Sequence, residues 1–149
     1  MTADTWFSLA NASVLPGWAL LAFLPRWRPG LWIAGLALPA SLSVLYATLL
    51  ALHVGGSEGG FGSLQEVAAL FGDPWLLLVG WVHYLAFDLF VGAWEVRDAQ
   101  RSGLPHLAIV PVLVLTFLAG PVGLLCYLLL RGLWKKRWQI DETSPAARS

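Results

Sequence analysis

Charged residues are scarce in this sequence. Only 12% of its 149 residues are Asp, Glu, Lys or Arg, whereas a soluble domain usually carries about 25%. Nine basic residues balance nine acidic ones, so the formal net charge is zero. This balance excludes a basic nucleic-acid-binding protein, and we expect no nucleic-acid partner.

Cysteine and histidine are also rare. Cys126 is the only cysteine, so no intramolecular disulfide can form. Three histidines are too few for the histidine boxes of membrane di-iron enzymes. The sequence contains neither the His-Glu-x-x-His pattern of zinc sites nor the Glu-x-x-His pattern of di-iron bundles. We therefore expect no metal site and no cofactor.

Long apolar stretches dominate what is present. Hydrophobic residues make up 58% of the chain, and its mean hydropathy is +0.69. A membrane-spanning helix needs about 20 mainly apolar residues to cross about 30 Å of hydrocarbon. Four stretches meet this requirement, at 6–24, 31–52, 75–96 and 107–130. We predict an all-α integral membrane protein with four transmembrane helices, one domain over 1–149 and a polar tail over 131–149.

The tryptophans support these limits. Amphipathic indole rings prefer the headgroup level of a bilayer and form an aromatic belt there. Of the nine tryptophans, only Trp18 and Trp81 lie deep inside an expected span. The others lie at or just beyond span ends, at Trp6, Trp27, Trp32, Trp75, Trp94, Trp134 and Trp138.

The connection between the second and third spans predicts a short helix. A Gly-rich piece over 55–62 reads as a flexible linker, and Ser63 followed by Glu66 forms a capping box. The helix that it opens, through Phe71, is amphipathic and is expected on the membrane surface. Four spans would leave both termini on one side, with five basic residues there and four opposite. Orientation is therefore not predicted.

The third span carries the candidate site residues. At about 100° per residue, Tyr84, Asp88 and Glu95 fall in one narrow stripe, which His83 flanks. Ionisable groups in a membrane usually face the bundle interior. We expect His83 and Asp88 to be catalytic, as acid and base, and to face inward together. The expected substrate-binding residues are Asn11, Trp81, Tyr84 and Glu95.

Two further readings concern the same residues. Polar groups in a bundle can act purely as interhelical hydrogen bonds, with no catalytic role. Near the end of the third span, we expect Glu95 close to Arg97 or solvent, and Asp98 in the following loop in a solvated ion pair with Arg97 and Arg101.

Residues 80–98, Gly-Trp-Val-His-Tyr-Leu-Ala-Phe-Asp-Leu-Phe-Val-Gly-Ala-Trp-Glu-Val-Arg-Asp, resemble a known family. The family is that of the abscisic-acid-deficient-type, or neoxanthin synthase-like, membrane proteins. Shorter matches are Leu15-Pro16-Gly17-Trp18, Phe61-Gly62-Ser63-Leu64 and Gly120-Pro121-Val122-Gly123, and the resemblance covers roughly residues 6 to 130.

The resemblance implies isomerisation of a carotenoid or similar isoprenoid, by opening a violaxanthin epoxide to the allene of neoxanthin. That chemistry requires an acid at the epoxide oxygen and a base at a neighbouring C–H, without a redox cofactor. Because the first span begins almost at once, with no transit peptide before it, we expect a bacterial inner membrane.

The alternative readings are a non-catalytic membrane protein that binds a pigment, a lipid or a partner helix, and a proton-linked transporter. Discontinuous helices in repeated halves, which are typical of transporters, are not evident in the sequence. Membrane lipid is an expected partner, and a homo-oligomer is left open.

Overall fold

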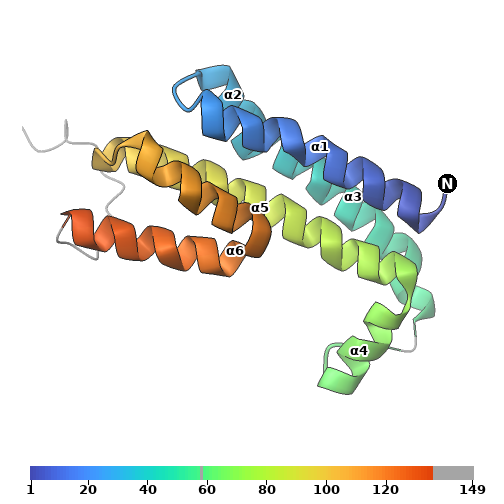
Figure 1. Cartoon of the computed structure of the whole chain (residues 1–149). Coiled ribbons are helices and arrows are strands. Elements are labelled where there is room, and N and C mark those ends of the chain that lie inside the picture. Colours follow the sequence, from blue (N-terminus) through green and yellow to red (C-terminus); the bar gives the residue numbers. More distant parts are fainter. Residues whose placement is uncertain (58, 136–149) are drawn as a thin grey trace, which may run out of the picture.

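The computed structural model describes residues 1–57 and 59–135, and every regular element among them is a helix. Figure 1 shows the long helices lying side by side, with one short helix beyond an end of the bundle. In chain order, the elements are α1 (Ala3–Phe23), α2 (Arg28–Trp32), the π-helix η1 (Ile33–Ala37), α3 (Leu38–His53), the 3-10 helix η2 (Val54–Gly56), α4 (Leu64–Gly72), α5 (Pro74–Ser102) and α6 (His106–Lys135).

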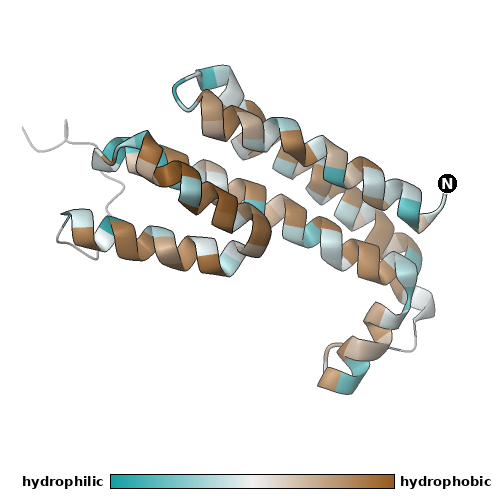
Figure 2. Cartoon of the chain, viewed as in Figure 1, coloured by the Kyte–Doolittle hydropathy of each residue, from teal (hydrophilic) through white to brown (hydrophobic). Residues whose placement is uncertain are grey.

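Four helical stretches are long and apolar enough to cross a membrane. They are α1, the continuous run from α2 to η2, α5 and α6. Apolar residues extend along most of their lengths (Figure 2), and large side chains such as Phe87, Phe90, Leu118 and Leu129 are exposed. Exposed apolar surface on this scale suits a lipid environment. The all-α membrane fold predicted from hydropathy is confirmed.

The helix starts follow the expected local chemistry. The Ser63 hydroxyl accepts a hydrogen bond of 3.2 Å from the backbone N–H of Glu66 and opens α4, as the capping box predicts. The Asp73 carboxylate accepts bonds of 2.7 and 3.1 Å from the first N–H groups of α5, with Pro74 in the first turn. At the other end of α5, Gly103 takes the left-handed conformation (φ 70°) that ends the helix.

Helix α5 is the centre of the bundle, in contact with α1, α3, α4 and α6. It continues to Ser102, six residues beyond the expected end of the third span. Close approach to α1 depends on small residues, because a Cβ atom at Gly92 would come within 2.7 Å of the Trp18 ring. Residues throughout α5 therefore lie against a neighbouring helix.

Helix α6 has the expected length and composition, but it does not run from one end of the bundle to the other. Its backbone leaves the helical conformation at Ala119 (φ −153°, ψ 61°), and the second half then turns back along the first (Figure 1). A Cβ atom at Gly123 would lie 2.2 Å from the backbone nitrogen of Thr116. Seven residues of straight helix would separate these positions by about 10 Å.

Proline chemistry explains why α6 turns at this point. Pro121 has no N–H and its ring excludes the carbonyl four residues earlier, which is that of Phe117. The Tyr84 hydroxyl on α5 donates a 3.1 Å hydrogen bond to this freed carbonyl. Neighbouring helices satisfy the carbonyls that prolines free in this way within membrane bundles.

The reversal determines where α6 ends. At 1.5 Å per residue, the halves over 106–118 and 120–135 are about 20 and 24 Å long, which is shorter than the hydrocarbon layer. The end of α6 at Lys135 thus returns to the end of the bundle where α5 finishes (Figure 1). Residues 131–135 of the expected polar tail belong to α6, and 136–149 lie outside the described residues.

Candidate functional site

The face of α5 that meets α6 carries the predicted polar stripe. Tyr84, Asp88 and Glu95 all turn toward the α6 hairpin, as their helical spacing predicted. The Asp88 carboxyl lies against the turn, where a Cβ atom at Gly120 would come within 2.2 Å of its Oδ1. Its Oδ2 is buried without a hydrogen-bond partner among the residues that the structure describes. The hairpin closes this polar face.

Glu95 is fully buried, with none of its surface exposed. The Thr116 hydroxyl lies 3.1 and 3.0 Å from its two carboxyl oxygens and donates to the carboxyl. The expected position near Arg97 or solvent is wrong. Glu95 is about two turns inside the end of α5, because the helix runs on to Ser102, and α6 covers it.

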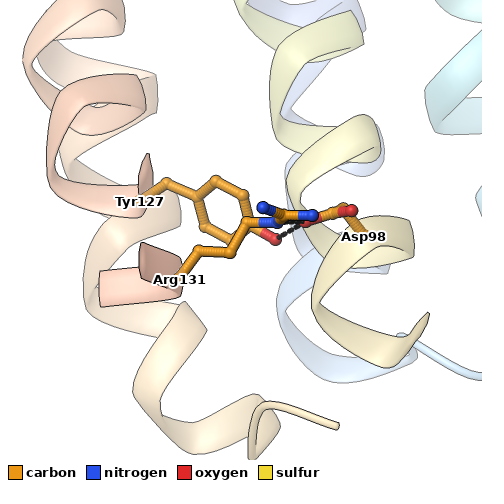
Figure 3. A network of polar contacts seen from close by, with 3 residues as sticks. All are labelled: Asp98, Tyr127 and Arg131. Atoms are coloured by element: carbon orange, nitrogen blue, oxygen red, sulfur yellow. Dashed lines mark hydrogen bonds and ion pairs between the residues drawn. The ribbon is translucent and has the colours of Figure 1, made fainter. Parts of the chain in front are cut away.

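Asp98, Tyr127 and Arg131 form a buried network (Figure 3). The Arg131 Nε and the Tyr127 hydroxyl both donate to Asp98 Oδ2, at 2.5 and 2.6 Å. Asp98 and Arg131 are each 2% exposed. The expected solvated ion pair of Asp98 with Arg97 and Arg101 is therefore wrong, because the returning half of α6 supplies different partners.

His83 lies on a different face of α5 and is exposed. Its ring stacks on Phe87 with centroids 4.4 Å apart, and the Tyr46 ring of α3 is 5.7 Å away. Five residues separate His83 from Asp88, which turns the two side chains about 140° apart on a straight helix. The expectation that both face inward together is wrong, although the catalytic role of each stays a prediction.

A cavity of about 210 Å³ adjoins His83 between α3, α4 and α5. His83 and Tyr46 are the only polar side chains in its lining. Sequence reasoning missed Tyr46, although its phenol in an otherwise uncharged span was an available signal. The remaining lining is apolar: Leu50, Val54, Phe61, Leu70, Phe71, Leu76, Val79 and Gly80.

A second apolar cavity lies one turn further along the seam between α3 and α5. It has a volume of about 380 Å³, and Phe87, which stacks on His83, lines it together with Phe90 and Ser43. A third cavity, of about 450 Å³, shares Gly35, Leu36 and Phe90 with it. We call these three cavities, which follow one another along α5 from Gly80 to Arg97, the α3–α5 groove.

Asn11 and Trp81 connect α1 to α5, next to Tyr84, whose ring lies 5.2 Å from that of Trp81. The Trp81 indole N–H donates a 3.1 Å hydrogen bond to the Asn11 side-chain oxygen, and the Phe7 ring lies 5.5 Å from the indole. These contacts account for both polar groups without a ligand. Their substrate-binding roles, like those of Tyr84 and Glu95, stay predictions.

The described residues contain no group of three or more His, Cys, Asp and Glu side chains placed to hold a metal ion. The carboxyls of Glu95 and Asp98 face α6 instead, and His83, which adjoins a cavity, faces α3. The fold and these sites define a multi-pass, all-helical membrane protein with a polar, closed central helix face.

Comparison with protein families narrows this class. The chain belongs to the ABA4-like family, described as ABA DEFICIENT 4-like, which matches residues 5–127. The resemblance noted in the sequence is confirmed. No curated protein matches the chain, and no solved structure matches it. Location in a bacterial inner membrane stays a prediction.

Proposed function

We propose that this chain is a membrane-embedded isomerase of a carotenoid or similar isoprenoid. One end ring of the substrate occupies the cavity beside His83, and the polyene chain lies along the α3–α5 groove. The observation that carries the proposal is the partly open apolar cavity with two polar side chains, His83 and Tyr46.

The dimensions of the cavities support placing the end ring beside His83 and the polyene chain along the rest of the groove. Sites for drug-sized ligands usually measure about 300–1,000 Å³, so a cavity of about 210 Å³ suits an end group rather than a whole carotenoid. From Gly80 to Arg97 the groove follows α5 for about 25 Å, at 1.5 Å per residue. An elongated apolar molecule matches this length and lining.

The position of His83 supports a change in the expected catalytic pair. Opening an epoxide to an allene moves one proton to the ring oxygen, as the C–O bond breaks, and removes another from the neighbouring chain carbon. Reactant and product are isomers, so one proton enters and one leaves. We assign this exchange to His83, with the Tyr46 hydroxyl as its partner at the ring, because Asp88 faces α6.

The test is conversion in cells that make violaxanthin, with products separated by chromatography. His83→Ala should lower the yield of allenic product by about 100-fold, the scale of lost acid–base catalysis, and Tyr46→Phe should also lower it. His53→Ala is the matched control, because His53 stacks on Trp75 outside the cavity. Asp88→Asn should retain most of the yield. A collapse with Asp88→Asn and full activity with His83→Ala would overturn the assignment.

Pigment binding without chemistry gives a different result. Carotenoid would then copurify unchanged, and His83→Ala would weaken its retention rather than its conversion. Purified protein that neither converts nor retains carotenoid would contradict both the isomerase and the binding function, and the family would define a fold alone.

One observation favours a second candidate, proton-linked transport. Transporters bind coupling ions where helices are interrupted within the membrane, and α6 is interrupted at Ala119 opposite the unpartnered Asp88 Oδ2. Proton uptake into proteoliposomes that is abolished by Asp88→Asn and unaffected by His83→Ala would support this candidate. Equal uptake by both variants and the unaltered protein would contradict it.

A further inference from the structure

One end of the bundle is strongly basic. Arg26 and Arg28, in and after the connection that follows α1, and Arg97 and Arg101, near the end of α5, are all exposed. The carboxyls on the last turns of α5 do not neutralise them, because Glu95 bonds to Thr116 and Asp98 pairs with Arg131 and Tyr127. The described part of this end therefore presents uncompensated positive charge.

The reversal of α6 increases this asymmetry. Lys135 returns to the same end, together with Arg131 in its pair with Asp98, whereas the opposite end carries Asp4, Glu66 and Asp73 and no lysine or arginine among the described residues. Basic residues accumulate on the cytoplasmic side of membrane proteins, next to a leaflet rich in anionic lipids. The basic end thus meets the surface that offers negatively charged headgroups.

A polar cavity of about 520 Å³ opens at this end between the two helix connections. Arg26 and Arg28 line one side, and Gln100 and His106 line the other. Two hydrogen bonds hold the connections together across it, from Gln100 Nε2 to the Pro25 carbonyl (2.5 Å) and between His106 Nε2 and the Ala22 carbonyl (2.8 Å). The cavity is therefore held in shape without a ligand.

The polar cavity continues into the apolar end of the α3–α5 groove. Arg28 and Leu31 line both this cavity and the adjoining one of about 450 Å³. Beyond Arg28, that adjoining cavity is lined by Trp32, Leu36 and Phe90, with Arg97 at its side. A basic cavity next to an apolar one matches an amphiphile with an anionic head group and a long apolar chain.

We propose that this end binds an anionic phospholipid, with its phosphate between Arg26 and Arg28 and an acyl chain along Trp32, Leu36 and Phe90. Guanidinium groups bind phosphate oxygens through paired, charge-assisted hydrogen bonds. Basic pockets between helices on the cytoplasmic side are known positions for anionic headgroups. The phosphate position can be tested apart from the isomerase function, because Arg26 and Arg28 lie at the other end of the groove from His83. An acyl chain along Leu36 and Phe90 would compete with the polyene chain for that part of the groove.

The test is native mass spectrometry of the full chain with phosphatidylglycerol and phosphatidylcholine of identical acyl chains. We expect the protein to retain one phosphatidylglycerol in preference to phosphatidylcholine. Arg28→Gln should lower that retention by about tenfold, the scale of one lost charge-assisted hydrogen bond. Arg101→Gln is the matched control, since it removes the same charge from the same end but lines neither cavity.

Three outcomes would overturn the proposal. The first is equal retention of the two lipids, and the second is an equal loss of retention in Arg28→Gln and Arg101→Gln. The third is displacement of the lipid by inorganic phosphate alone, which would indicate a phosphate site that does not bind a lipid chain. Arg28→Lys, which keeps the charge, should recover part of the retention. Gel filtration of each variant separates loss of the site from loss of the fold.

Discussion

The two faces of α5 that meet α6 and α3 differ in polarity and in openness. Toward α6, Glu95 and Asp98 are buried and bonded to Thr116, Tyr127 and Arg131. Toward α3, the lining is apolar apart from a few polar groups, and cavities of about 210 and 380 Å³ follow one another. Glu95 and Asp98 on the polar face are bonded to their own partners, Asp88 Oδ2 is buried there without one, and the apolar face is left open.

This difference separates structural polarity from functional polarity. A buried carboxylate is costly unless it is paired and hydrogen-bonded, so the α6 hairpin is the element that makes the carboxyl face tolerable. His83 has ring contacts but no hydrogen bond to the described residues, and it borders a cavity. The density of ionisable groups is thus a poor guide to the site in this bundle.

The largest expected effect concerns the hairpin itself. A fourth helix that crossed the membrane would end on the side where the chain begins, whereas the reversal at Ala119 brings Lys135 to the end of the bundle opposite the N-terminus. Reporter fusions at the two ends of the full chain should report opposite compartments, with the C-terminal fusion in the cytoplasm. Fusions that report the same compartment would show that α6 crosses the membrane.

The next expected effect comes from the buried ion pair. Arg131→Met should lower the free energy of unfolding by about 3–5 kcal/mol, because it leaves the Asp98 charge buried without its cation. Adding Asp98→Asn should recover most of this loss, since the amide is neutral and its oxygen can still accept from Tyr127. Unfolding in SDS, followed by tryptophan fluorescence, measures both. A double variant no more stable than Arg131→Met alone would contradict a structural role for the pair.

A smaller effect is expected at the close contact within the hairpin. Gly123→Ala places a methyl group 2.2 Å from the backbone nitrogen of Thr116. Rotation of a side chain cannot relieve this clash, because it is with the backbone. The expected cost is about 1–3 kcal/mol, the range for overpacked sites. Gly72→Ala at the end of α4 is the matched control, because nothing lies within 4 Å of its Cβ position. Equal unfolding curves for both variants would mean that the halves of α6 are not in contact.

Sequence reasoning predicted what depends on local pattern. Hydropathy identified the long helices, and capping chemistry identified the start of α4. Helical spacing placed Tyr84, Asp88 and Glu95 on one face. These features follow from a few neighbouring residues, so composition and period are sufficient to predict them.

The rest depends on contacts between distant residues. Hydropathy measures length but not direction, so it does not distinguish a kink at Gly120-Pro121 within a span from a reversal there. The partners Asp98 and Arg131 are 33 residues apart, and they meet only because α6 turns back. One signal was available in the sequence. If the third helix is extended to Asp98, that residue lies about 40° from Tyr84, at 100° per residue, and so continues the polar stripe.

The smallest expected effect compares one hydroxyl from each face of α5. Tyr84→Phe removes the donor to the Phe117 carbonyl, which Pro121 has already freed from its helical bond. An acceptor left unpaired in apolar surroundings costs about 1 kcal/mol or somewhat more. Tyr46→Phe removes a hydroxyl for which no hydrogen bond is present in the described residues, so stability should change by less than about 0.5 kcal/mol.

The two variants should show the reverse order in carotenoid conversion, because Tyr46 borders the His83 cavity and Tyr84 does not. Unfolding in SDS and product yield, measured on the same pair of proteins, therefore test whether α6 holds the fold while the α3–α5 groove holds the substrate. A Tyr84→Phe variant that loses activity at full stability would reverse that assignment and return the site to the carboxyl face.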